Sequence, residues 1–413
     1  MGKMSKNTNT KTNQGRQLAV WVGALAVGGI LGWLHVEWLD GLFHFIATVF
    51  TRLFQLVAVP TIALAVITTL SSLGQRQETG RIFLHTLTYT LLTTVAAAVV
   101  GLVLYVVISP ENIDAFPTEE DWSGSVKELS YYDHLLSVVP NNVVEPFAKG
   151  NVLSILLIAA AVGLALAFMP KSDNVQVLIK GIFGLQELLF VLIRALIRVL
   201  PLGIVAFAGQ LSGQLSAGVM VGSLGKYVAV ILGGNLLQFF VVLPLFLLAR
   251  GLNSWKVLKA MSPAVLMALF TKSSAATLPV TMQSAEERLG VRGEVARFVL
   301  PICTTINMNG CAAFILVTSL YVMQNGGMRL DWPTMLVWLV VAVVSAIGNA
   351  GVPMGCYFLT FSLMAGVGAP LGIMGLILPL FAVIDMVETA ENVWSDSCVC
   401  AMVASCPPQD GRA

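Results

Sequence analysis

The chain has 413 residues and a formal net charge of +1, with 57% hydrophobic and only 11% charged residues. An ordinary soluble domain carries roughly 25% charged residues, so the composition excludes that class and predicts a polytopic membrane protein in contact with the lipid bilayer. There is no basic cluster, so nothing indicates binding of nucleic acid.

The six cysteines all lie in the last third of the chain, mostly within apolar stretches, and the hydrophilic loop has none. We therefore do not expect a disulfide framework. Cys398 and Cys400 are better explained as small residues packing on a helix than as a metal pair. No histidine follows His134 and no nucleophile–base spacing is present, which argues against an embedded hydrolase or a histidine zinc site.

The first part of the chain contains regular apolar stretches, and a membrane span needs about 20 apolar residues. These stretches are residues 18–36, 41–70, 83–108, 152–169, 178–207 and 227–249. Pro60 predicts a tilt or kink in the second stretch, and two arginines with Pro201 interrupt the fifth. The basic tail 1–16 predicts a cytoplasmic N-terminus, and the acidic segment 110–134 fits the outside.

The pattern changes after residue 250, where apolar segments are broken by polar, glycine and proline residues. Segments 255–288 and 332–367 are broken at 271–279 and 348–355, whereas the span 294–323 is interrupted at 304–310. Paired broken segments of this kind are typical of the inverted-repeat binding site of a secondary transporter. Non-helical backbone at membrane depth needs protein or water around it, so we expect the breaks to meet as re-entrant tips.

The last span, residues 371–404, carries four carboxylates within residues 385–396. A carboxylate near the bilayer centre costs roughly 2.5–3.5 kcal/mol on insertion scales, which predicts a functional role. At about 100° per residue one stripe of the helix holds Asp385, Glu388, Asn392 and Asp396, with Thr389 at its edge. Glu391 and Trp394 fall off this stripe. We expect Glu391 to pair or reach water, and Trp394 to pack.

These residues resemble the glutamate/neutral amino acid transporter family, the dicarboxylate/amino acid:cation symporters. The matching motifs are KSSAATLPVTM (272–282), NMNGC (307–311), NAGVP (349–353), the segment 385–396, and the upstream segments 52–60 and 138–152. The likeness implies an all-α fold of eight transmembrane helices and two re-entrant hairpins, with inverted repeats and an elevator mechanism. It also implies a homotrimer in the cell (inner) membrane with both termini cytoplasmic.

The same resemblance implies a division of the chain into two working parts. Residues 17–250 would form largely the trimerisation scaffold, although spans near 83–108 and 227–249 would join the transport domain. Residues 251–405 would form the transport core with both hairpins, followed by a tail at 406–413.

The resemblance also implies the ligands, namely a small amino acid and coupled sodium ions, without another cofactor. Asp385 would bind the α-amino group and Asn392 the α-carboxylate, and the whole substrate set is Ser274, Cys311, Val352, Asp385, Glu388, Thr389 and Asn392. The first sodium site would use Cys303, Asn307, Asn392 and Asp396. The second would use Thr305, Met308, Ala346 and Asn349.

A third sodium site of the family is weakened in this chain. Thr93 and Thr94 remain, but Asn309 replaces the aspartate of the family motif and Thr90 replaces an aromatic hydroxyl. Hard cations need oxygen ligands with formal negative charge, so we expect fewer than three coupled sodium ions, or a proton in place of one.

Glu388 replaces the arginine that pairs with the side chain of acidic substrates in the family. A glutamate there would repel such substrates, which favours a neutral amino acid, with Glu388 neutralised by Lys272 or a proton, or a cationic one. An acidic substrate in a rearranged site is the alternative. Cys311, in place of the usual threonine, also reduces hydrogen bonding to the substrate. A proton-coupled exchanger and an anion-conducting, channel-like member are the other functions left open.

Overall fold

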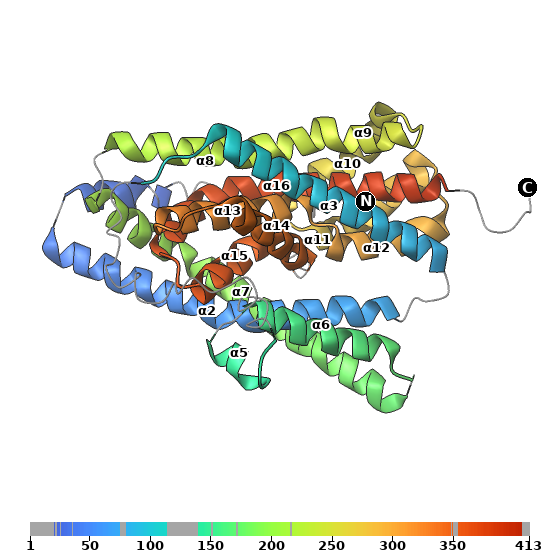
Figure 1. The fold of residues 1–413 in the computed structure, drawn as a ribbon, viewed down its shortest axis with the longest axis horizontal. Coiled ribbons are helices and arrows are strands. Elements are labelled where there is room, and N and C mark those ends of the chain that lie inside the picture. The colour runs from blue at the N-terminus through green and yellow to red at the C-terminus, as the bar shows by residue number, and fades with distance from the viewer. Residues whose placement is uncertain are drawn as a thin grey trace, which may run out of the picture.

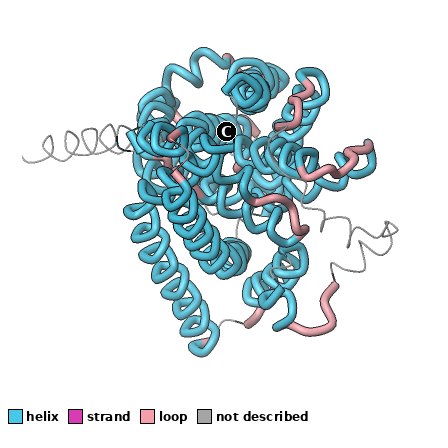
Figure 2. Tube along the Cα trace, turned by 90° about the vertical axis from the view of Figure 1, so that its left-hand side faces the viewer, coloured by secondary structure: helices cyan, strands magenta, loops and turns pink. Residues whose placement is uncertain are grey.

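A computed structural model describes residues 20, 23–24, 26–34, 36–74, 80–113, 139–149, 152–170, 172–214, 217–347, 349 and 354–406. All regular structure in this part of the chain is helical (Figures 1 and 2), in agreement with the expected all-α fold. The predicted tails and most of the acidic segment 110–134 lie outside the described residues.

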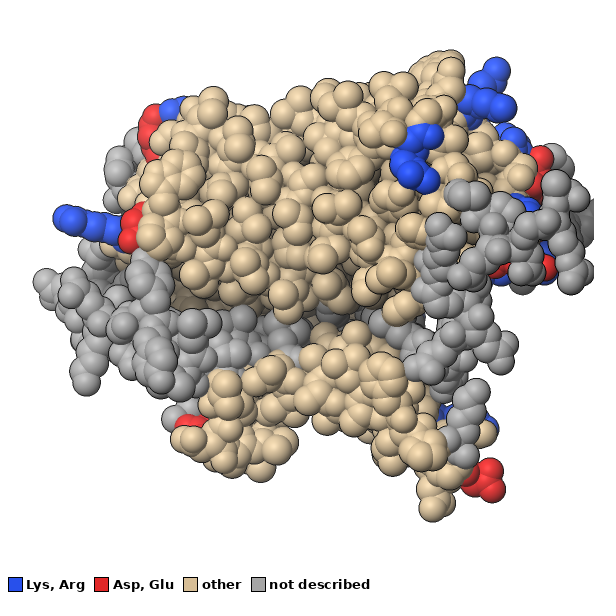
Figure 3. Space-filling model, turned by 45° about the vertical axis from the view of Figure 1, so that its right-hand side comes forward, with Lys and Arg blue, Asp and Glu red and all other residues tan. Residues whose placement is uncertain are grey.

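The surface of the molecule is that of a multi-pass membrane protein. Lys, Arg, Asp and Glu gather toward the two ends of the face in Figure 3, and other residues fill most of the middle. Four described helices are long and apolar enough to cross a membrane, or five if a helix pair bent by 73° is one span. They are Ile82–Ile108, Asp173–Ile193, Gly222–Ala249, Gly293–Asn325 and the pair Gly372–Leu378 with Val383–Ala404. The total of eight expected from the resemblance stays a prediction.

Helices α2 (Glu37–Gly74), α6 (Val152–Phe168) and α7 (Asp173–Gln214) form one layer, with the short helix α5 (Val144–Lys149) beside it (Figure 1). Helix α2 packs along both α6 and α7. The sequence predicted an interruption of the fifth stretch at Pro201, but α7 is continuous and 42 residues long. A single proline removes one helical hydrogen bond, which a long packed helix tolerates.

A second group of helices surrounds the C-terminal part of the chain. It contains α3 (Gly80–Ile108) and the nearly continuous unit α8 (Ala217–Leu237), η3 (Gln238–Val242) and α9 (Leu243–Ala249). Helix α3 packs against α8 and α13 (Asn309–Asn325), and α8 also contacts α13 and α16 (Gly372–Ala404). Figure 1 places α8 on the side of α16 opposite to α2, and α3 runs across α16 in this view.

The segments predicted to be broken at 271–279 and 304–310 are broken in the structure, whereas most of the predicted break at 348–355 lies outside the described residues. The three segments comprise α10 (Ser254–Thr271), α11 (Ser274–Gln283) and η4 (Ser284–Leu289), then α12 (Gly293–Ile306) and α13, then α14 (Trp332–Ile347) and α15 (Gly355–Gly366). Helix α16 follows and contacts α10, α11, α12, α13 and α15. The first break is shorter than the predicted 271–279, because Pro279 lies inside α11.

The close packing of α6 on α2 depends on Gly163. A methyl group at this position would lie 2.8 Å from Cβ of Leu70 and 3.2 Å from Cα of Ile67. We expect Gly163→Val to lower the free energy of unfolding by about 1–3 kcal/mol, the usual effect of overpacking. Thermal unfolding of the purified protein measures this. Gly181→Val is the matched control, because nothing lies within 4 Å of a methyl group there; equal effects of the two changes would contradict the packing argument.

Candidate functional site

The first hairpin turns between α10 and α11 at Lys272 and Ser273. Lys272 adopts the left-handed conformation (φ 53°), which ends α10, and the Ser273 side chain accepts a hydrogen bond from the Ala276 amide at 3.2 Å. Ser273 is thus an N-cap, a position that favours serine. Ser274, the first residue of α11, is buried. The small residues of the motif therefore form a tight tip that presents a helix N-terminus.

The second break separates α12 from α13 at Asn307 and Met308. Both residues have non-helical backbone (ψ 69° and 66°), as the predicted interruption at 304–310 requires. The amide of Gly310 donates to Oδ1 of Asn392 at 2.9 Å, which joins the start of α13 to α16. The break thus brings backbone polar groups to the face of α16.

The predicted stripe on α16 is buried. Asp385, Glu388, Thr389, Asn392 and Asp396 are each no more than 6% exposed. Oδ2 of Asp385 and both carboxylate oxygens of Glu388 have no hydrogen-bond partner. Buried charge without a partner is unfavourable, so the stripe favours a positively charged ligand.

Asp396 lies at the centre of a polar network around the second break. The Asn307 amide donates to Oδ1 of Asp396 and to Ser395, both at 2.9 Å. Cys303, a further predicted ligand residue of this site, is fully buried, and its sulfur lies 3.9 Å from the Thr90 hydroxyl. The structure therefore brings together the residues predicted for the first sodium site around one carboxylate.

The residues predicted for the third site satisfy one another. Thr94 donates to Oδ1 of Asn309 at 2.8 Å, and Thr93 donates to Oδ1 of Asn307 at 3.1 Å. The Asn309 amide in turn donates to Ser395 at 2.7 Å. These bonds join neutral side chains, so this corner of the network needs no cation to balance it.

The residues predicted for the second sodium site lie where α12 and α13 approach α14. Met308, Ala346 and Asn349 are buried. The backbone amide of Asn349 donates to the carbonyl of Ala346 at 3.1 Å. The Thr305 hydroxyl donates to the carbonyl of Ile302 at 2.8 Å. Val352, predicted at the substrate, lies outside the described residues, as do its neighbours 350, 351 and 353.

The charges that act most strongly on Glu388 are those of Asp385 and Glu391, which are both negative. Lys272 interacts electrostatically with Asp385. Neutralisation of Glu388 by Lys272 or by a proton stays a prediction.

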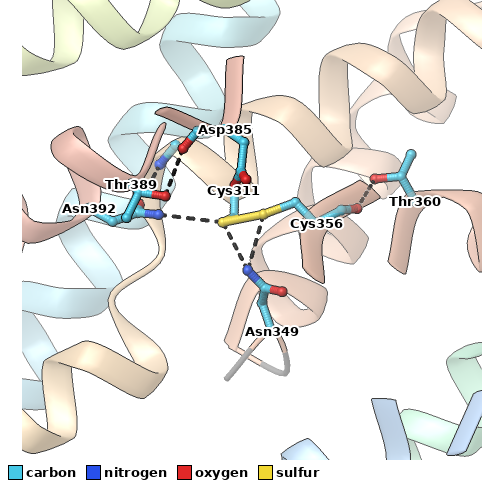
Figure 4. Close-up of a disulfide and its surroundings, with 8 residues drawn as sticks. Cys311, Asn349, Cys356, Thr360, Asp385, Thr389 and Asn392 are labelled. Atoms are coloured by element: carbon cyan, nitrogen blue, oxygen red, sulfur yellow. Dashed lines mark hydrogen bonds between the residues drawn. A yellow bond between two sulfur atoms is a disulfide. The ribbon is translucent and has the colours of Figure 1, made fainter. Parts of the chain in front are cut away.

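One disulfide, between Cys311 of α13 and Cys356 of α15, is present among the described cysteines. The sequence analysis did not expect a disulfide framework, and it did not identify this single pair. The two cysteines are 45 residues apart and lie on separate apolar helices that only the fold brings together. The side-chain amide of Asn349 donates to both sulfurs, at 3.0 Å to that of Cys311 and 3.1 Å to that of Cys356 (Figure 4). Cys398 and Cys400 are free and fully buried, in keeping with packing.

Trp394 and Glu391 both lie on α16 outside the stripe, and their surroundings differ. Trp394 packs as expected, is fully buried and donates to the carbonyl of Phe239 at 3.0 Å. Glu391 was expected to pair or reach water. It is 1% exposed and interacts with the Gly310 backbone and the Asn309 side chain, although neither carboxylate oxygen makes a hydrogen bond of good geometry. A methyl group on Gly310 would lie 2.9 Å from Oε2 of Glu391 and 2.7 Å from Oδ1 of Asn235, which is also unbonded.

Glu391 and Asn235 are thus polar residues whose positions the sequence analysis missed. Glu391 carried a signal, since it is an acidic residue within an apolar span, and residues 388–403 of that span are buried in the structure. Asn235, a polar residue near the apolar end of helix α8, carried a similar one. Together they place two polar side chains against Gly310.

Comparison with known proteins supports one family. The family model for the sodium:dicarboxylate symporter family matches residues 18–406. Rabbit (Oryctolagus cuniculus) excitatory amino acid transporter 3 is 27% identical over 86% of this chain and 77% of its own length. Bovine (Bos taurus) neutral amino acid transporter B(0) is 28% identical over 92% of this chain and 76% of its own length. A putative sodium-dependent excitatory amino acid transporter, glt-4 of Caenorhabditis elegans, is 28% identical over 87% of this chain and 82% of its own length.

The unpaired acceptors beside Gly310 give a stability prediction. Glu391→Gln supplies an amide donor that can bond to Oδ1 of Asn235 and removes a buried acidic group. Because an unsatisfied buried polar group costs about 1–3 kcal/mol, we expect the free energy of unfolding to rise by about that amount. Thermal unfolding in detergent measures it. Glu391→Val, which adds no donor, should give a smaller gain, and a lower melting temperature for Glu391→Gln would contradict the argument.

Proposed function

Since the chain belongs to the sodium:dicarboxylate symporter family, whose members and relatives are transporters and not enzymes, we propose that it is a secondary active transporter that couples sodium to the movement of an amino acid across the membrane. The observation that carries this proposal is the buried stripe of Asp385, Asn392 and Asp396 on α16, which faces breaks in two other elements. Breaks of this kind at membrane depth are where transporters of small ions and solutes bind their ligands.

The stripe offers complementary groups for the parts that all amino acids share. Oδ2 of Asp385 is buried and unbonded, so an α-ammonium group would supply the charged hydrogen bond that this oxygen lacks. Helix α11 contacts α16, and its N-terminus with Ser274 would receive the α-carboxylate together with Asn392. Thr389 lies at the edge of the stripe and lines this site in the proposal.

Sodium binding is proposed at the first and second sites of the family. Asp396 supplies the formal negative charge that a hard cation needs, and the side chain of Asn307, whose amide nitrogen donates to that carboxylate, is a further residue of this proposed site. Thr305, Met308, Ala346 and Asn349 provide the second site, largely through backbone oxygens. The third site is proposed to be lost or weak, because Thr93, Thr94, Asn307 and Asn309 already satisfy one another.

The substrate is proposed to be neutral or cationic. Glu388 has negative neighbours and two unbonded oxygens, so a dicarboxylate would meet repulsion there. A side-chain ammonium or guanidinium would instead find an acceptor in Glu388. For a neutral substrate, Glu388 would be neutralised by Lys272, which also interacts electrostatically with Asp385, or by a proton.

The division of labour within the fold is proposed by analogy with the family. The layer of α2, α6 and α7 would be the scaffold of a homotrimer, and α3 with α8 would move together with the C-terminal core (Figure 1). The packing of α3 and α8 on α13 and α16 supports this grouping. The elevator motion, the eight spans with two hairpins, the cell (inner) membrane and the cytoplasmic termini belong to the same proposal.

A competition panel in proteoliposomes tests the substrate class. Acidic, neutral and basic amino acids compete with saturable, sodium-dependent uptake, and a sodium-free control separates a proton-coupled exchanger or a channel from the symporter. We expect Glu388→Arg to improve competition by acidic amino acids at least about tenfold, which corresponds to 1.4 kcal/mol.

Glu388→Gln is the matched variant, because it removes the charge and keeps the size of the side chain. It should weaken competition by basic amino acids and leave neutral ones little changed. Unchanged selectivity in both variants would mean that Glu388 does not face the substrate.

The number of coupled sodium ions gives a second test. We expect fewer than three sodium ions per substrate, measured as charge and sodium-to-substrate flux ratios in proteoliposomes. Asn309→Asp restores the charge of the family motif beside Thr94, so this variant should couple more sodium than the wild type. Three ions coupled by the wild-type protein would contradict the proposal, and Asn112→Asp, remote from the stripe, serves as a control.

A further inference from the structure

Cys311, Cys356 and Glu388 form a buried cluster contributed by three different helices. One ligand atom from each residue, two sulfurs and one carboxylate oxygen, lies within 4.8 Å of the others. Within the described part of the chain, this is the only group of three or more His, Cys, Asp or Glu residues that meets this criterion. The cluster shares Glu388 with the stripe and Cys311 with the predicted substrate set, and none of its three residues belongs to the sodium sites proposed above.

The surroundings of the cluster favour a positive charge. Both oxygens of Glu388 are unbonded in a side chain that is 1% exposed. The Asn349 amide donates to both sulfurs, and the Asn392 amide points to Cys311 at 3.5 Å. Figure 4 shows these two amides flanking the sulfurs from different sides. Amide donors directed at sulfur stabilise thiolates and orient them as metal ligands.

The donor set identifies the class of cation. Two thiolates with a carboxylate suit Zn²⁺ and similar softer divalent cations, whereas sodium, magnesium and calcium prefer oxygen ligands. Oδ1 of Asn349 is also buried and unbonded, and it lies so near Gly355 that any side chain at Gly355 would overlap it. Asn349 is therefore held against the sulfurs.

We propose that Cys311 and Cys356, once their disulfide is reduced, bind a zinc-class divalent cation together with Glu388. Reduction by a dithiol or a phosphine in water supplies two electrons and two protons, which turn the disulfide into two thiols. Binding of Zn²⁺ then displaces the two thiol protons and forms two sulfur–metal bonds. The disulfide and the metal complex are alternative states of the same pair of cysteines.

Either state fastens the second hairpin, and this consequence rests on the proposed function. Cys356 lies on α15, directly after the hairpin break, whereas Cys311 and Glu388 lie on α13 and α16. A bound metal ion would tie these three helices together beside the substrate position. Transport requires the substrate to enter and leave, so the metal ion inhibits uptake.

Binding of Cd²⁺ to the full-length protein in detergent, after reduction with a phosphine, tests the site directly. Sulfur-to-cadmium charge-transfer absorbance should saturate at one Cd²⁺ per chain, and Zn²⁺ should compete. Cys356→Ser and Cys356→Ala should both lose this absorbance, and the oxidised wild type should lack it. Cys400→Ser, at another fully buried cysteine, should bind as the wild type does.

Uptake separates this proposal from the proposed function. Zn²⁺ should inhibit sodium-dependent uptake by the reduced wild type but not by Cys356→Ser. Absence of cadmium binding to the reduced wild type, or binding that persists in both Cys356 variants, would overturn the metal site. Cadmium binding without any sodium-dependent uptake would instead overturn the proposed function alone.

Discussion

The constraint on which the rest of the structure depends is the burial of four carboxylates on one helix. Asp385, Glu388, Glu391 and Asp396 are each no more than 5% exposed, inside a protein whose composition suits lipid. Isolated buried anions are strongly unfavourable, and replacing water by fixed dipoles compensates only in part. Such a helix is stable when cations accompany it. Under the proposed function, sodium at Asp396 and an ammonium group at Asp385 would each relieve part of this cost, and any coupling between their binding would be reciprocal.

The broken helices follow from the same constraint. An unbroken helix satisfies its own backbone groups and offers a neighbouring carboxylate nothing but side chains. The turn at Lys272 and Ser273 and the break at Asn307 and Met308 direct backbone ends at α16 instead. The amide of Gly310 bonding to Asn392 is one result. Glycine at 310 is needed because Asn235, Glu391 and the backbone of Glu388 approach it closely.

The sequence was informative for features that depend on residues close together along the chain. It was less informative for features that depend on how distant helices pack. The helical period predicted the stripe on α16, and polar interruptions predicted the breaks at 272 and 307. The same period misplaced Glu391, because an off-stripe face was assumed to reach water or a partner, and α16 is enclosed by protein on every side there. The pairing of Cys311 with Cys356 depends on how α13 meets α15, which no local pattern encodes.

Two departures from the family pattern lie close together, and both change the charge of the site. Asn309 stands where the family motif has a carboxylate, while Glu388 puts a carboxylate where the family has arginine. The backbone of Glu388 and the carboxylate of Glu391 both lie against Gly310, the residue that follows Asn309. Relative to the family pattern, negative charge is therefore moved away from the proposed third cation site and toward the proposed substrate position and the cysteine pair. Under the proposed function, a site with that distribution would bind fewer coupling ions and would favour a positive group beside Cys311, whether that group belongs to a substrate or is a metal ion.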